Sequence, residues 1–77
     1  MFTIRIATGV AQKPNGECHA VIAYLTSEGI DHKDMRLVNQ CYAGSAKIVC
    51  LRDLTELQVA AVWQLDKVTM VKKGSDP

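Results

Sequence analysis

Aromatic side chains are scarce in this chain, whose 77 residues include one Trp, one Phe and two Tyr. Net charge is also small, because nine Lys and Arg face eight Asp and Glu, which gives +1 at pH 7. A charge this small creates no global field that would by itself attract nucleic acid or anionic lipid. Long apolar runs are missing as well, so the sequence predicts neither a signal peptide nor a membrane span.

The cysteines form no regular framework, because there are three of them, Cys18, Cys41 and Cys50. An odd, irregular set indicates reduced thiols, and we therefore expect a cytoplasmic protein. Metal-ligand spacings such as C-x2-C and H-x3-H do not occur, so the sequence predicts no metal site and no cofactor. Buried cysteines acting as small hydrophobes are the simplest interpretation. A thiol-dependent enzyme or a metal site at these three positions is kept as an alternative.

What the chain does have is a high apolar content, 48%, with 22% charged residues. These values are typical of a compact globular domain. We expect one α+β domain over residues 1–73, followed by a flexible tail over residues 74–77, where two chain-breaking residues lie. A domain this small buries a limited core and gains stability from a partner.

Two interpretations compete over residues 2–26, and both begin with a strand, because Phe2, Ile4 and Ile6 alternate with polar residues. The segment 13–17 has a Pro-Asn-Gly centre that is typical of a hairpin loop, which favours a β-hairpin over residues 2–26. The alternative makes residues 17–28 a helix that ends at Gly29 in the left-handed conformation. Several β-branched residues argue against this helix, and the hairpin is favoured.

The segment after residue 34 predicts two strands, a helix and a short final strand. Residues 35–51 predict a second antiparallel hairpin, in which the later strand is apolar on both faces and therefore central. Thr55 and Gln58 match a capping box, so we expect a helix over about residues 55–67 that packs on the sheet. A short final strand around residues 68–72 would lie at an edge guarded by lysines. The predicted fold is therefore a small antiparallel sheet against one C-terminal helix.

If the helix alternative is correct, the element order becomes βαββαβ, which resembles the ferredoxin-like fold that RNA-recognition motifs use. The segments Phe2-Thr3-Ile4-Arg5 and Lys47-Ile48-Val49-Cys50 lack the stacking aromatic residues of the two signature strands of those motifs. The resemblance is therefore one of topology and implies no function.

The C-terminal helix has apolar residues on two sides. At 100° per residue, Leu57, Ala61, Leu65 and Val68 form one stripe, which we expect to lie on the sheet. Val59 and Trp63, four residues apart, point away from that stripe. Small residues on the first predicted hairpin would let a partner approach closely. The predicted protein interface comprises Trp63, Val59, Ala7, Gly9 and Ala23.

No catalytic constellation and no glycine-rich nucleotide motif is present in the sequence. We therefore expect a non-catalytic protein-binding module, an adaptor or inhibitor of a larger protein, whose partner is another protein or a second copy of the chain in a homodimer. Its size would suit an inhibitor encoded by a virus or mobile element. The alternative is a nucleic-acid-binding module, which is less favoured and would use a basic face made of Lys47, Arg52, Lys67, Lys72 and Lys73.

Overall fold

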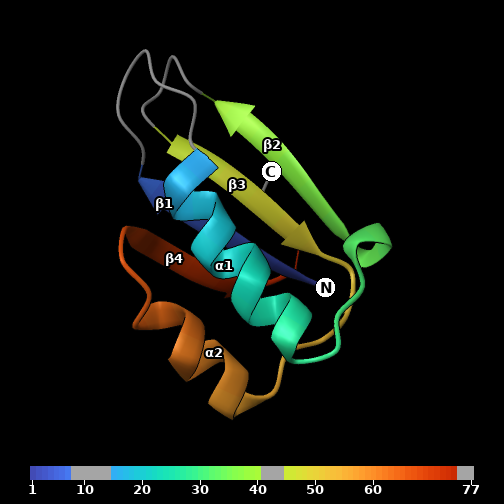
Figure 1. Ribbon diagram of the computed structural model, residues 1–77. Helices are drawn as coiled ribbons and strands as arrows, with labels where there is room; N and C mark the ends of the chain where they lie inside the picture. The colour runs from blue at the N-terminus through green and yellow to red at the C-terminus, as the bar shows by residue number, and fades with distance from the viewer. Residues whose placement is uncertain (8–14, 41–44, 75–77) are drawn as a thin grey trace.

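The computed structural model describes residues 1–7, 15–40 and 45–74, which form a four-stranded sheet with two helices on one of its faces (Figure 1). The elements follow one another as βαββαβ, with a short 3-10 turn before the second strand. Their bounds are β1 Phe2–Ala7, α1 Asn15–Ser27, η1 His32–Asp34, β2 Met35–Gln40, β3 Ser45–Cys50, α2 Glu56–Trp63 and β4 Val68–Lys73.

The strands lie in the order β2-β3-β1-β4, and every neighbouring pair is antiparallel. The predicted α+β class, the second hairpin with β3 inside the sheet, the capped C-terminal helix and the final edge strand are all confirmed. The order of elements is also that of the ferredoxin-like alternative.

The predicted hairpin over residues 2–26 is wrong, because Asn15–Ser27 is a helix. Strand β1 pairs with β3 on one side and with β4 on the other, so neither of its edges is open to a strand from residues 17–26. The helix buries Cys18, Val21 and Leu25, which recur at helical spacing and are at most 1% exposed. Burying such side chains contributes about 1.5 to 3 kcal/mol each, which outweighs the few tenths by which β-branched residues disfavour a helix.

The end of α1 follows the pattern expected for the helix alternative. Gly29 has φ +87°, and its N–H donates to the carbonyl of Thr26 at 3.0 Å. The N–H of Ile30 reaches back to the carbonyl of Leu25 at 3.1 Å, and both of these side chains are buried. These two bonds form a Schellman motif, which stops the helix and places Ile30 in the core.

The core lies between the helices and the inner face of the sheet, which is the face that carries Ile4, Ile6 and Ile48. Alternation along each strand sends the intervening residues to the outer face, which neither helix covers (Figure 1). The sheet therefore presents one side to the helices and one side outward.

The β1–β4 pairing is irregular at one point. Arg5 pairs with Met70 and Ile6 pairs with Val68, so Thr69 is an extra residue on β4, a β-bulge. The Thr69 hydroxyl donates to the carbonyl of Arg5 at 3.3 Å. The bulge shifts the alternation by one residue, so that Val68 faces the core as Val71 does.

The two ends of the described chain are fixed beside each other. The amino group of Met1 donates to Asp53 at 2.6 Å, and the N–H of Gly74 donates to the carbonyl of Met1 at 2.8 Å. The hydrogen bond and the charge of that amino group hold the pKa of Asp53 below its ordinary value. Residues 75–77 lie outside the described part of the chain, so flexibility of the predicted tail stays a prediction.

Candidate interaction surface

The outward side of α2 carries the largest exposed apolar side chains of the helix layer. Leu57 is 83% exposed and Trp63 is 45% exposed, with the exposed Ala60 between them. Leu57 and Ala60, and Ala60 and Trp63, are each three residues apart and so are neighbours on the helix surface, and the three together cover about a third of its circumference. We call them the α2 outer face.

The opposite side of α2 holds the helix on the sheet. Val62 is fully buried, and Val59 and Leu65 pack partly buried against the core. The predicted stripe placed Leu57 on the sheet, and the structure shows that this was wrong. The helix ends at Trp63, so Leu65 and Val68 reach the core from the following turn and strand rather than from the helix.

The start of α2 is fixed by the capping box that the sequence predicts. The N–H of Gln58 donates to the Thr55 hydroxyl at 3.2 Å, and the N–H of Thr55 donates to the side-chain oxygen of Gln58 at 2.9 Å. The amide nitrogen of Gln58 also donates to Glu28, at the end of α1, at 3.2 Å. These bonds fix where the helix begins, and so they fix that Leu57 points outward.

The predicted interface residues do not form one surface. Trp63 is exposed as expected, whereas Val59 packs against the core. Ala23 is exposed on α1, and Ala7 lies on the sheet at a position that alternates with the buried Ile6. Gly9 lies outside the described residues. Leu57 was missed, and a helix phase set by Val62 instead of Leu57 would have found it.

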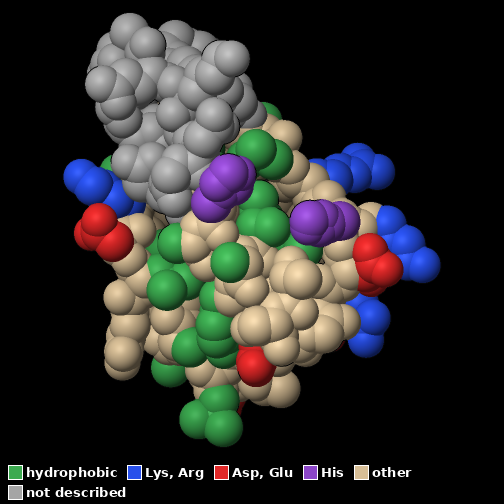
Figure 2. All heavy atoms as spheres, in the orientation of Figure 1, with side chains coloured by type: hydrophobic (Ala, Val, Ile, Leu, Met, Phe, Trp, Pro, Cys, Tyr) green, Lys and Arg blue, Asp and Glu red, His purple; other side chains and the backbone are tan. Residues whose placement is uncertain are grey.

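The one charged residue within α2 is the exposed Glu56, and no Lys or Arg lies between Glu56 and Trp63. In Figure 2, which looks onto the helices, green and neutral side chains occupy the middle of this side, and the blue Lys and Arg side chains lie toward its rim. The exposed positions of α1 include His19, Ala20, Ala23 and Thr26, none of which is a Lys, Arg, Asp or Glu. A helix face with exposed apolar residues and no cation does not favour a polyanion.

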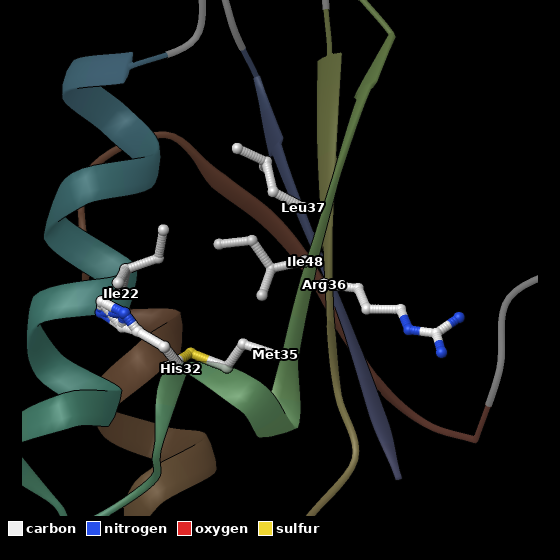
Figure 3. Close-up of a pocket in the computed structure, with 6 residues that line it drawn as sticks. All are labelled: Ile22, His32, Met35, Arg36, Leu37 and Ile48. Atoms are coloured by element: carbon white, nitrogen blue, oxygen red, sulfur yellow. The ribbon is translucent and has the colours of Figure 1, made fainter.

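A shallow cavity of about 170 Å³ lies between α1 and the edge strand β2. Ile22, Leu37 and Ile48 point into it, and the end of Arg36 points away from it on the other side of the sheet (Figure 3). Leu37 remains 49% exposed, because α1 does not extend over the whole inner side of β2. The walls of this cavity are mostly apolar, and the cavity is smaller than the sites that hold drug-sized ligands. The remaining residues around it are His32 and Met35.

The five lysines and arginines of the predicted basic face are not on one face. Lys47 and Lys72 alternate with buried core positions and belong to the outer side of the sheet, whereas Lys73 pairs with the inward-facing Phe2. Arg52 lies 3.6 Å from Asp34. Lys67, with φ +69°, lies in the turn between α2 and β4. The predicted basic face is therefore divided among four places.

Cys18 and Cys50 are buried in the core and neither forms a disulfide, and Cys41 lies outside the described residues. Within residues 1–7, 15–40 and 45–74, no three His, Cys, Asp or Glu side chains are grouped so that they could hold a metal ion. Over the same ranges, no helix has the length and apolar character needed to cross a membrane.

The chain matches no protein family, no curated protein and no solved structure.

Proposed function

We propose that this chain is a non-catalytic protein-binding module, an adaptor or inhibitor, that contacts its partner through the α2 outer face. The observation that carries the proposal is the position of Leu57, which exposes 83% of its surface next to the half-exposed Trp63. Scattered exposed apolar residues are ordinary, but an exposed Leu and an exposed Trp on one short helix that has no cation are candidate interface anchors. The partner is another protein or a second copy of this chain.

A reducing compartment such as the cytoplasm suits this module, because Cys18 and Cys50 are buried and neither forms a disulfide. Buried thiols of this kind behave as small apolar residues that help to fill the core. A role as a virus- or mobile-element-encoded inhibitor is consistent with the size of the chain and rests on size alone.

The fluorescence of Trp63 provides the test, because it is the one tryptophan of the sequence. Covering the indole in a complex removes it from water, so we expect its emission to shift to shorter wavelength on association. Sedimentation velocity over a range of concentrations distinguishes a second copy from another partner. For another partner, the tagged chain is used to capture proteins from the native extract.

Leu57→Asp is the test variant, and Leu51→Asp is its matched control. Leu51 is also apolar and exposed, at 41%, but it follows β3 and lies outside α2. We expect Leu57→Asp to abolish self-association or capture, and Leu51→Asp to leave it unchanged. A monomer at every concentration, together with no captured protein that distinguishes the two variants, contradicts the proposal.

A further inference from the structure

The edge of the sheet at β2 is open to another strand. β2 lies at one end of the sheet order, and among the described residues it pairs with β3 alone. Natural edge strands are often blunted by lysine or proline, and neither occurs in the six residues of β2. Its Leu37 is 49% exposed and its Val38 is 39% exposed. β2 is therefore a template on which a further strand can form.

One hydrogen bond fixes which backbone groups of β2 face this open edge. The N–H of Leu51 donates to the carbonyl of Asp34 at 2.7 Å, one step before the first residue pair of β2 and β3. Antiparallel pairs alternate between hydrogen-bonded and non-hydrogen-bonded, so every second residue of β2 turns its backbone groups toward β3. The other three residues turn theirs outward, and they are Met35, Leu37 and Asn39. These three residues carry six such groups, and the N–H of Met35 donates to the carbonyl of His32, which leaves five.

The side chains of β2 favour one register for pairing with a second copy. Opposite residues of an antiparallel pair lie on the same face of the sheet, so a two-fold axis perpendicular to the sheet passes through a residue. An axis at Arg36 sets two guanidinium groups directly opposite each other, which disfavours pairing. An axis at Val38 sets each Leu37 opposite the polar Asn39. An axis at Leu37 sets the two half-exposed leucines opposite each other, so apolar contact favours this register.

We propose that two copies of this chain join through β2, antiparallel and with the two-fold axis at Leu37, so that their sheets become one. Each Leu37 N–H then donates to the Leu37 carbonyl of the other copy, and each Asn39 N–H donates to the Met35 carbonyl of the other copy. These bonds use four of the five outward groups of each copy. The axis keeps both helix layers on the same side. The cavity beside Leu37 in Figure 3 therefore lies next to the second leucine.

The size and the charges of this contact predict how it behaves in solution. Each copy contributes the six residues of β2, against about 20 to 30 residues a side in a standard interface. We therefore expect a weak dimer that dissociates on dilution. The two Arg36 residues lie diagonally across the axis, about 8 Å apart, which is about the Debye length at physiological ionic strength. Added salt screens their repulsion further, so it should strengthen the dimer rather than weaken it.

The first experiment is sedimentation velocity of the full chain over a range of protein and salt concentrations. Leu37→Lys is the test variant, and Leu51→Lys is its matched control, because Leu51 is 41% exposed and lies outside β2. We expect Leu37→Lys to raise the dissociation constant more than about tenfold, because it removes both leucines and sets two ammonium groups opposite each other. The control should leave the constant unchanged. A cooperative thermal transition at low concentration shows that each protein is folded.

Cysteine cross-linking tests the register without destabilising the dimer. In a Cys41→Ser background, Leu37→Cys places two thiols at the axis, with Cα atoms about 5.5 Å apart, which a disulfide can span. Val38→Cys places its two Cα atoms about 8 Å apart, which is too far for a disulfide. Cys18 and Cys50 are buried in both variants. On oxidation, we expect a covalent dimer from Leu37→Cys and none from Val38→Cys.

Four results overturn the proposal. They are a monomer at every concentration, equal weakening by Leu51→Lys, a covalent dimer from Val38→Cys in place of Leu37→Cys, and capture of another protein through Leu37 by a chain that stays monomeric alone. Leu57→Asp leaves β2 unchanged, so it should abolish capture of another protein and leave this dimer intact. A dimer that Leu57→Asp dissociates is joined through the α2 outer face and also overturns the proposal. The two proposals therefore fail separately.

Discussion

Replacing Leu57 and Val62 by alanine, one at a time, tests how α2 sits on the sheet. With 83% of its surface exposed, Leu57 has about a sixth of its surface covered. Full burial of a leucine contributes about 1.5 to 3 kcal/mol, so its covered part contributes about 0.3 to 0.5 kcal/mol. Alanine also favours a helix slightly more than leucine does. We therefore expect Leu57→Ala to change the free energy of unfolding by less than about 0.5 kcal/mol.

Val62→Ala should behave differently, because Val62 is fully buried. The substitution removes two carbon groups worth about 0.8 kcal/mol each and leaves a cavity. The expected loss of stability is about 2 kcal/mol, which lowers the melting temperature by roughly 8 to 16 °C in a domain of this size. Leu57→Ala should lower it by less than about 4 °C.

The assay is thermal unfolding followed by circular dichroism at low protein concentration, with urea unfolding as a second measure. Low concentration matters because binding between copies stabilises the folded state and would add an interface contribution to the effect of Leu57→Ala. If Leu57→Ala costs as much as Val62→Ala under these conditions, the helix is rotated relative to the structure. The α2 outer face would then not exist as described.

Three further outcomes are expected. Thr55→Ala removes the hydroxyl that accepts the N–H of Gln58, and it should lower the free energy of unfolding by about 1 kcal/mol in urea titrations; no change would show that the capping box contributes nothing. Gly29→Ala should cost about 1 to 2 kcal/mol in the same assay, entirely from the positive φ, because a Cβ there has no atom within 4 Å. Partial burial, the charge of Glu28 and a hydrogen bond to Glu28 raise the pKa of Tyr24 above its ordinary value of 10.0. The neutral phenol therefore contributes to the free energy of unfolding below pH 10, and this contribution is lost as pH rises through the raised pKa. Ultraviolet titration of the phenol should move its midpoint downward in Glu28→Gln, and an unmoved midpoint contradicts the role of that carboxylate.

The sequence was sufficient for the parts of the fold that local signals determine. Thr55 and Gln58 mark the start of α2 through bonds that depend only on neighbouring residues. The alternation of Phe2, Ile4 and Ile6 predicts β1 for the same reason. Residues 17–26 were different, because their spacing suits either a strand or a helix. Their conformation was decided by the long-range pairing of β1 with β3 and β4, which occupies both of its sides.

The candidate surfaces were predicted less well, because each depends on where an element ends or how strands align. Leu57 was placed on the sheet by extending helical spacing beyond Trp63, where the helix stops. Arg36, Lys47 and Lys72 lie far apart in sequence, and only the strand register brings them onto one face. The net charge of +1 gave no indication that basic residues gather on the outer side of the sheet, because acidic residues elsewhere in the chain cancel their charge.

The bulge at Thr69 makes the two borders of the sheet unequal. The bulge lies on the edge strand β4, and a bulged edge strand twists away and is a poor template for another strand. The other edge strand, β2, pairs with β3 over six consecutive residues without a bulge. Edge-to-edge pairing of two copies is therefore favoured at β2 over β4. In a pair of copies joined through β2, the two free edge strands would both be the bulged β4. Such pairing would therefore favour a closed pair over a fibre.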